Sequence, residues 1–322
     1  MISKQNSTNG RSIPQTPWLL RAGMALGAVA PPVGALLGER LFLTPPRHVA
    51  PPGEREALAS GAAFAVPFHR GRLRGWRFGE GPAVLLVHGW GGRAGQLLPL
   101  ATALAQAGCS AVAFDGPAHG VSSGRLASVP LFAEAVTMLS ERLAVQAVVA
   151  HSMGAAGTAV AILSGLKLDA AVFLGPPRSP AAFFEQFSQA FSLRRALEHA
   201  TRLRLERRFG LPLHAYDLPR LAGDARTPLL VVHDRNDAEV PFADGEAISA
   251  SWHGAQLVAT SGLGHRRILR DPGVLSEVCR FVAERIGRCE CGRLAPRVVG
   301  GGRLCDGCAL ESWLRDREGR WA

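Results

Sequence analysis

The stretch "VVAHSMG" at residues 148–154 decides the fold of this chain. Its apolar residues have the continuous pattern of a buried strand, and the small-residue segment at 153–165 has helical spacing. Ser152 therefore stands on a turn between a strand and a helix, which is the position of the serine in a nucleophile elbow. The turn needs small residues two positions to either side. Gly154 meets that need, and Ala150 stands where a glycine is usual.

Short apolar runs alternate with longer periodic segments along most of the chain. We expect strands at 83–88, 110–115, 147–152, 170–175, 228–234 and 256–260, and helices at 94–108, 130–143, 153–165 and 274–286. Alternation of this kind predicts an α/β fold with a mostly parallel sheet and helices on both faces. Burial on both faces also explains why the strands are continuously apolar.

A long interval separates the strands predicted at 170–175 and 228–234. It far exceeds what one crossover helix requires, and residues 179–210 have helical periodicity without a strand pattern. We therefore predict a helical insertion at about 178–224 that lies over the edge of the sheet as a lid. The phenylalanines of the insertion could line an acyl pocket, and its arginines could attract acidic substrates or lipid headgroups. An amphipathic insertion, with the phenylalanines on an apolar inner face and the arginines on a solvated outer face, is favoured over these roles.

A serine hydroxyl is a poor nucleophile unless a general base activates it. His265 lies in a loop after the last predicted strand and is the candidate base. Asp234 and Asp237 follow the preceding strand and are the candidate acids. The order Ser, Asp, His along the chain is the one found where a nucleophile elbow carries the serine.

With these residues the sequence resembles the α/β-hydrolase family. "VVHDRNDAEVP" (231–241) is similar to the family's G-x-x-D-x-x-V-P loop, in which Asp237 matches the acid and Asp234 stands in place of the glycine. The resemblance therefore favours Asp237 over Asp234 as the third member of a triad with Ser152 and His265.

Two further motifs carry the same resemblance, which covers about residues 70–288. "VHGWGGRAG" (87–95) is similar to the family's H-G-x loop, and "FDGPAHGVSSGR" (114–125) resembles its D-x-x-G-x-G-x-S loop. The resemblance implies that the backbone N–H groups of Trp90 and Met153 form the oxyanion hole.

The resemblance implies a serine hydrolase that cleaves a carboxylic ester with a short to medium acyl chain through an acyl-enzyme. A thioesterase or a C–C hydrolase would use the same triad. A non-catalytic hydrolase-like module that binds through its C-terminal tail or its basic insertion is a third alternative. We expect a small-molecule ester as the partner and no cofactor for catalysis.

Four cysteines cluster in the C-terminal tail at 289–322 as C-x-C followed by C-x2-C: Cys289, Cys291, Cys305 and Cys308. Two such pairs joined by a glycine-rich loop predict a structural Zn²⁺ site, because four thiolates close the tetrahedral shell. Disulfides and free thiols are the alternatives. Zinc would favour a reducing compartment, and we expect a cytoplasmic protein.

The N-terminal part divides into a polar tail at 1–17, expected to be disordered, and a helical extension with a Pro-rich link at 18–56. The hydrolase domain is expected at 57–288. The apolar run within the extension is shorter than the ~20 residues that span a bilayer. Helices packed on the domain are favoured, with contact to a membrane surface and an export signal as alternatives.

The 322-residue chain has a formal net charge of +10, supplied almost entirely by arginine because Lys4 and Lys167 are its only lysines. The arginines are scattered along the sequence and form no basic block interleaved with aromatic residues. This distribution is typical of solvated surface charge, and we expect no nucleic-acid partner.

Overall fold

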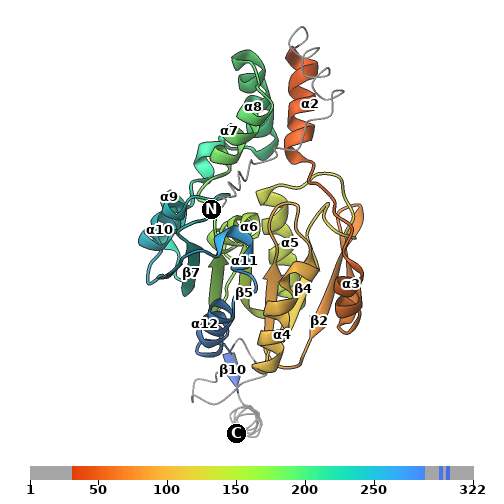
Figure 1. The fold of residues 1–322 in the computed structure, drawn as a ribbon, viewed down its shortest axis with the longest axis vertical. Coiled ribbons are helices and arrows are strands. Elements are labelled where there is room, and N and C mark those ends of the chain that lie inside the picture. The colour runs from red at the N-terminus through yellow and green to blue at the C-terminus, as the bar shows by residue number, and fades with distance from the viewer. Residues whose placement is uncertain (1–30, 287–296, 300–301, 305–322) are drawn as a thin grey trace, which may run out of the picture. The chain divides into compact units, whose positions relative to one another are not determined.

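The structure is a computed structural model that describes residues 31–286, 297–299 and 302–304 (Figure 1). It divides into two units. One comprises Met1–Phe42 and Pro180–Ala215, and the other comprises Leu43–Ser179 and Tyr216–Ala322. The polar tail at 1–17, the apolar residues 18–30 and the four clustered cysteines lie outside the described residues.

The larger unit contains an eight-stranded sheet with the strand order β1-β2-β4-β3-β5-β6-β7-β8. The strands are β1 (Ala62–Phe68), β2 (Gly71–Phe78), β3 (Ala83–Val87), β4 (Ser110–Asp115), β5 (Val145–His151), β6 (Ala170–Leu174), β7 (Leu229–Asp234) and β8 (Gln256–Thr260). The β1–β2 and β2–β4 pairs are antiparallel, and all other pairs of this sheet are parallel. The predicted α/β fold with a mostly parallel sheet is confirmed.

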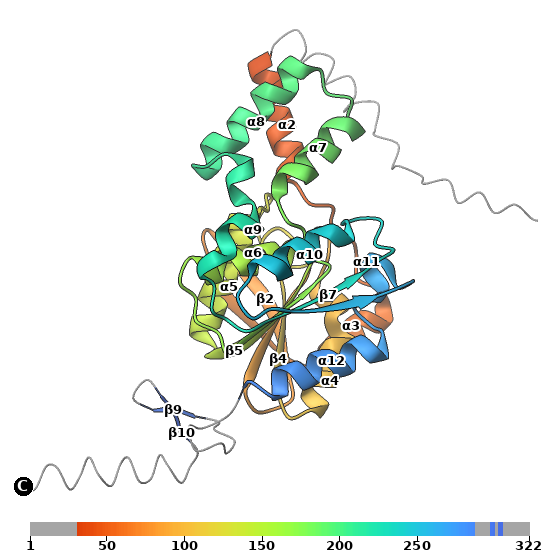
Figure 2. The same ribbon diagram turned by 90° about the vertical axis from the view of Figure 1, so that its left-hand side faces the viewer.

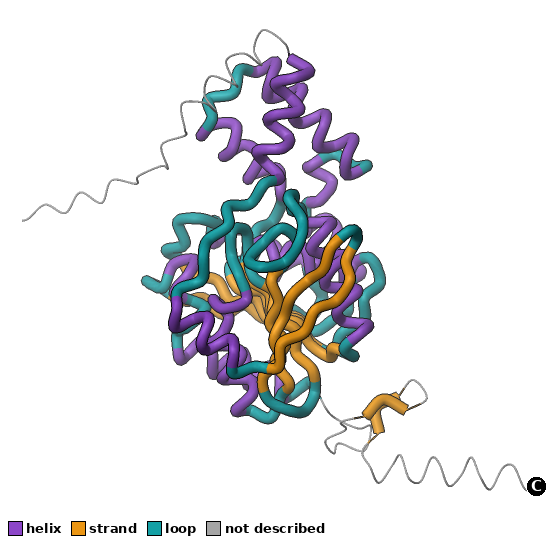
Figure 3. The backbone as a smooth tube through the Cα atoms, turned by 90° about the vertical axis from the view of Figure 1, so that its right-hand side faces the viewer, coloured by secondary structure: helices purple, strands orange, loops and turns teal. Residues whose placement is uncertain are grey.

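Helices cover both faces of the sheet (Figures 2 and 3). One face packs against α5 (Val129–Arg142), α6 (Met153–Leu163), α9 (Leu218–Leu221) and α10 (Phe242–Ser251). The other packs against α3 (Pro52–Ala59), η1 (Ala94–Leu97), α4 (Leu98–Gln106) and α12 (Pro272–Ala283). The hydrophobic core on the first of these faces contains Leu85 and Val87 of β3, and the second core, on the other face, contains Val84 and Leu86. Strand β3 is continuously apolar because both of its faces are buried.

Strands β1 and β2 have no counterpart among the predicted strands. They form an antiparallel hairpin at one edge of the sheet, and exposed or half-exposed positions interrupt its buried ones. Arg72 and Arg74 stand between glycines and apolar residues on β2, so no continuous apolar run marks that strand. Within the predicted tail, β9 (Arg297–Val299) and β10 (Gly302–Leu304) form a second antiparallel pair.

The strand order reverses at β3, and such a reversal marks the position where a ligand-binding site is expected. The chain goes from β3 to β4 on one side and then returns to β5 on the other. The loops that leave the carboxyl ends of β3 and β5 therefore diverge, and open α/β sheets bind their ligands in the crevice at such a switch point. The loop at 88–94 and Ser152 follow these two strands.

The smaller unit brings together helices from two distant parts of the chain: α2 (Pro31–Leu43), α7 (Pro180–Ala190) and α8 (Arg195–Phe209). The ring of Phe42 meets the edges of Phe184 and Phe187 at centroid distances of 5.6 and 5.4 Å. Phe184 is fully buried. It forms part of the packed interior of this unit, as the amphipathic interpretation of the insertion predicts. In the described ranges no helix is both long and apolar enough to cross a bilayer.

A buried carboxylate joins the helices of the smaller unit. Glu39 of α2 is 2% exposed, and it accepts hydrogen bonds from Arg204 at 2.7 Å and from Arg208 at 2.5 Å on α8. Burial raises the pKa of Glu39, but the hydrogen bonds and charges of Arg208 and Arg204 outweigh burial and hold the pKa below its ordinary value. Glu39 is therefore ionised at neutral pH and ties α2 to the insertion.

Replacing Glu39 with alanine is expected to destabilise the smaller unit by about 2 kcal/mol, which is less than the ~3–5 kcal/mol of a fully buried pair, since both arginines are partly exposed and can return to water. Hydrogen exchange of the α2 amides should accelerate accordingly. Glu198→Ala is the matched control, because its ion pair with Arg202 lies on the surface of α8 and should contribute less than about 0.5 kcal/mol. Equal protection of α2 in the two variants would contradict the role assigned to Glu39.

Candidate active site

Ser152 occupies the turn between β5 and α6 with φ = 53° and ψ = −124°, a backbone conformation that L-residues rarely adopt. Its N–H donates to the Leu174 carbonyl of the neighbouring strand at 3.0 Å. Small neighbours make the turn feasible. A Cβ at Gly154 would lie 2.5 Å from the His88 carbonyl oxygen, and one at Gly89 would lie 2.8 Å from the Ser152 Cβ. Ala150 is tolerated as a buried residue of β5.

Asp237 and His265 form a buried pair. The Nδ1 of His265 lies 2.7 Å from the Oδ2 of Asp237, with the two side chains 6% and 1% exposed. Because a carboxylate only accepts, Nδ1 carries the proton and Nε2 of His265 is left with a free lone pair. Such a ring is oriented to act as a base.

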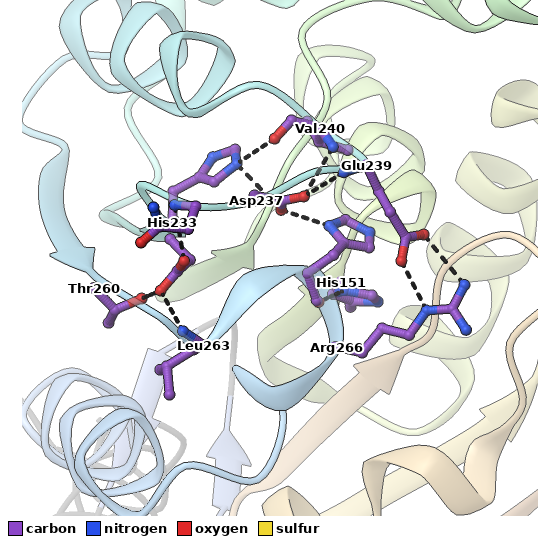
Figure 4. Close-up of polar contacts among 11 residues, drawn as sticks. His151, His233, Asp237, Glu239, Val240, Thr260, Leu263 and Arg266 are labelled. Carbon is purple, nitrogen blue, oxygen red and sulfur yellow. Dashed lines mark hydrogen bonds and ion pairs between the residues drawn. The ribbon is translucent and has the colours of Figure 1, made fainter. Parts of the chain in front are cut away.

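The other oxygen of Asp237 is held by the backbone. Its Oδ1 accepts from the N–H groups of Glu239 at 2.8 Å and Val240 at 2.9 Å (Figure 4). Burial opposes ionisation of Asp237, but hydrogen bonds from His233, His265 and Val240 outweigh burial and hold its pKa well below the ordinary value. Asp237 is thus a fixed negative charge beside the His265 ring.

His233 is a contact of Asp237 that the sequence analysis misses. Its Nε2 lies 3.2 Å from the Val240 carbonyl oxygen and 3.5 Å from the Oδ2 of Asp237, and its ring is fully buried. Figure 4 shows Asp237 between His233 and the loop residues that bind it. A polar residue near the end of the apolar strand β7 was the available signal.

Asp234, the alternative acid, has a different environment. Its Oδ1 accepts from the Asn236 N–H at 2.9 Å, and its Oδ2 accepts from the Thr260 hydroxyl at 2.8 Å and the Leu263 N–H at 2.9 Å. These bonds tie the loop after β7 to the end of β8 and the segment that precedes His265. The geometry supports Asp237 as the histidine's partner, as the family resemblance implies.

Contacts of neighbouring residues place the nucleophile candidate in the same region as the acid–base pair. His151, next to Ser152, donates from Nε2 to the His265 carbonyl at 2.9 Å, and the two rings lie 4.5 Å apart. A Cβ at Gly175 would lie 3.1 Å from the Nδ1 of His265 and 3.4 Å from the Oδ2 of Asp237. Gly175 directly follows Leu174, whose carbonyl binds the N–H of Ser152.

The candidate oxyanion donors belong to two segments, since Met153 directly follows Ser152 and Trp90 lies in the loop after β3. Met153 is the first residue of α6, so its N–H is one of those that a helix leaves without an intrahelical partner. Trp90 belongs to the loop after β3 and is 39% exposed. Gly89, which precedes it, lies against the Ser152 side chain. Their role as donors stays a prediction.

Three side chains join the loop after β3 to the loop after β4. The ring Nε2 of His88 accepts from the Gly116 N–H at 2.8 Å, and that of His119 accepts from the Gly91 N–H at 3.0 Å. The third contact is made by a carboxylate, since the Oδ1 of Asp115 accepts from the Ala94 N–H at 2.8 Å. Both histidines are fully engaged in holding backbone, which makes them structural residues.

Buried histidines around the site are held neutral. Burial is the main cause that lowers the pKa of His88 to about 4 and those of His119 and His151 to about 3. In the unfolded chain each would titrate near ~6.5. Their folded pKa values are depressed, so their stabilising contribution is complete above pH 6.5 and shrinks as the pH falls toward the folded values.

The free energy of unfolding is therefore expected to fall by about 3 kcal/mol between pH 6 and pH 5, since three unfolded-state histidines take up protons that the folded state does not bind. Urea unfolding at the two pH values measures the difference. His151→Gln should remove about a third of it, whereas His253→Gln, at an exposed position, should leave it unchanged. A stability that is flat over this range would contradict burial of neutral histidines.

Comparison with known proteins shows the family. The model of the alpha/beta hydrolase family matches residues 84–278, which is more than half of the chain. The chain belongs to the alpha/beta hydrolase family. The predicted family is thereby confirmed, and the matched segment includes Ser152, Asp237 and His265.

Solved structures of other alpha/beta-fold proteins resemble this alpha/beta hydrolase at low sequence identity. The esterase Pf2001 of Pyrococcus furiosus is 20% identical with a TM-score of 0.55, and the match covers 76% of this chain and all of the esterase. A hydrolase from Pseudomonas aeruginosa is 17% identical at a TM-score of 0.56, with 69% and 98% covered. A bromoperoxidase from Bacillus anthracis is 17% identical at 0.53, with 67% and 98% covered. Among curated proteins, no sequence matches.

Metal ligands are the last group of candidate site residues. In residues 31–286 and the short described strands beyond them, no group of three or more His, Cys, Asp or Glu side chains is placed to hold a metal ion. Cys109 is buried and Cys279 half-buried, and both are free thiols within the second core. The predicted zinc ligands Cys289, Cys291, Cys305 and Cys308 lie outside the described residues.

Proposed function

We propose that this alpha/beta hydrolase is a serine hydrolase that cleaves carboxylic esters with a short to medium acyl chain. The observation that carries the proposal is the 2.7 Å bond between His265 and Asp237, placed at the end of the sheet where Ser152 stands on its strained turn. Acyl transfer requires a base with a fixed tautomer together with a serine on such an elbow.

In the proposed mechanism, Nε2 of His265 takes the proton of the Ser152 hydroxyl while Oγ attacks the ester carbonyl carbon. The N–H groups of Trp90 and Met153 bind the oxygen that becomes negative in the tetrahedral intermediate. His265 then gives the proton to the leaving alcohol, and an acyl-enzyme remains on Ser152. Water, activated by the same ring, releases the acid and restores the serine.

Asp237 stabilises the imidazolium that forms in both steps. Its depressed pKa supports this role, because the carboxylate stays ionised throughout the pH range in which the enzyme would work. The two backbone N–H donors and His233 fix the carboxylate, so it can orient His265 without moving.

The test is covalent labelling of the full chain with a fluorophosphonate, followed by digestion and mass spectrometry. The expected result is one adduct per chain, located on the peptide that contains Ser152. An unlabelled chain, or an adduct on a different serine, would defeat the proposal. The unlabelled outcome would favour the alternative of a non-catalytic module that binds through its tail or its basic insertion.

The substrate class requires a second measurement. We expect the largest kcat/KM within a p-nitrophenyl ester series at acyl chains of two to eight carbons. The matching thioester series tests for a thioesterase, and a diketone that would be cleaved at a C–C bond tests for a C–C hydrolase; both alternatives use the same triad. A thioester preferred over its oxygen ester by more than about tenfold in kcat/KM would move the assignment to a thioesterase, since the chemistry of attack is shared.

Three further predictions concern the rest of the chain. We propose structural zinc on the four tail cysteines, with an expected one equivalent per chain by metal analysis of protein purified under reducing conditions. We also propose a cytoplasmic location. Contact of the N-terminal apolar segment with a membrane surface is the alternative.

The role of the helical insertion as a lid over the site also stays a prediction.

A further inference from the structure

Residues 43–47, here called the strap, contact the loop after β3, which carries Trp90, and the loop after β4. The Leu43 carbonyl accepts from the Ala127 N–H at 2.8 Å, and Leu43 is buried. The Pro46 ring lies against the loop after β3, since a Cβ at Gly91 would be 3.0 Å from its Cγ. The strap precedes the segment that the family model matches, so family membership assigns it no role.

Arg47 is the main contact of the strap. Its Nε donates to the Ala118 carbonyl at 3.0 Å, and its Nη2 donates to the carbonyls of Ser122 at 3.0 Å and Gly124 at 2.8 Å. One planar guanidinium therefore satisfies three acceptors that a lysine, with a single compact charge, cannot reach together.

The loop that Arg47 binds is strained and needs such support. Ala118 has φ = 65°, which is unfavourable for a residue with a Cβ, and Gly120 and Gly124 also have positive φ values. The loop forms no strand or helix, and besides the bonds that the N–H groups of Ala118 and Ser122 make within it, partners outside the loop bind its backbone. Arg47 supplies three such bonds at once.

The same loop positions the backbone of the candidate oxyanion hole. His119, one residue after Ala118, accepts from the Gly91 N–H through its ring. Gly91 follows Trp90, whose N–H is the proposed donor. A shift of the loop would move His119, and with it the amide next to the donor, by a similar amount.

We propose that Arg47 is a positioning residue of the oxyanion hole, acting through the loop at 118–124 and His119. The inference rests on the proposed function, because it assigns Trp90 a role in the reaction. It assigns the strap, which belongs to the N-terminal extension, a role in positioning the site. Without the guanidinium, the chemistry at Ser152 remains, but stabilisation of the oxyanion weakens.

Arg47→Ala is expected to lower kcat for p-nitrophenyl acetate by about tenfold with little change in KM, since complete loss of one oxyanion donor costs 10²- to 10³-fold and a displaced donor less. Rates are normalised to active sites titrated with the fluorophosphonate, so loss of folded protein does not count. Arg47→Lys should recover only part of kcat. Arg55→Ala is the matched control and should leave kcat unchanged, because this exposed side chain makes no hydrogen bond or ion pair within residues 31–286.

Two further measurements separate positioning from stability alone. Methylguanidinium should restore part of the kcat of Arg47→Ala and none in the control, because it can occupy the emptied site. The double variant Arg47→Ala/His119→Gln should lose no more than the worse single variant, since both act through one loop. Unchanged kcat per titrated site in Arg47→Ala would overturn the inference. Failure of the wild-type chain to be labelled would instead overturn the proposed function.

Discussion

Replacing Ser152 with alanine is expected to lower turnover of a p-nitrophenyl ester by a factor of about 10⁵ to 10⁶, because the residue that forms the acyl-enzyme is lost. What remains should be the weak acceleration that binding and the oxyanion donors give to direct attack by water. The free energy of unfolding should change by less than about 1 kcal/mol, since both residues carry a Cβ on the same strained turn.

The matched control is Ser164→Ala, at the exposed carboxyl end of the same helix. It should keep both full turnover and full labelling. Ester turnover by Ser152→Ala above a hundredth of the wild-type rate would mean that another group carries the reaction. In that case the strained turn at residue 152 would need a different explanation.

Asp237→Asn should lower kcat by about 10⁴-fold, because an asparagine amide permits the wrong tautomer of the neighbouring imidazole and removes the charge that stabilises it. His265 would then lack a fixed base nitrogen even though the bond distance could be preserved. The measurement is kcat/KM from pH 6 to pH 9 with p-nitrophenyl acetate. The loss should persist across this range, because the missing charge cannot be restored by raising the pH.

Asp234→Asn separates the two candidate acids. Asp234 binds Asn236, Thr260 and Leu263 and makes no described hydrogen bond to His265, so its replacement should lower the melting temperature and reduce kcat by less than about tenfold. The opposite pattern, with turnover lost in Asp234→Asn and kept in Asp237→Asn, would reverse the assignment of the acid.

Much of the fold follows from the sequence because burial on both faces leaves a strong pattern. Strands β3 and β4, and β8 at the far edge of the same sheet, lie where apolar runs predict them, although β8 is largely exposed. The hairpin β1–β2 escapes prediction for the opposite reason. Arginines and glycines interleave with apolar residues on a half-exposed edge, and local sequence cannot then distinguish a strand from a loop.

The residues of the candidate site also fall into those that a local motif predicts and those that only the structure reveals. Ser152, Asp237 and His265 stand in local motifs, and their convergence follows from the parallel order of the strands that carry them. His233 and Arg47 have no motif around them. Their importance lies in contacts, one to Asp237 and one to a loop about seventy residues further along the chain, that only the folded structure brings together.

The composition of the smaller unit has a consequence for synthesis of the protein. Glu39 and its partner Arg204 are 165 positions apart, so the ribosome exposes α2 long before it has made α8, whose arginines neutralise the Glu39 carboxylate. Closing so long a loop adds entropy cost only slowly with length, but it delays the contact. During that interval Phe42 lacks its aromatic neighbours. Apolar surface that is exposed in this way promotes aggregation of the nascent chain.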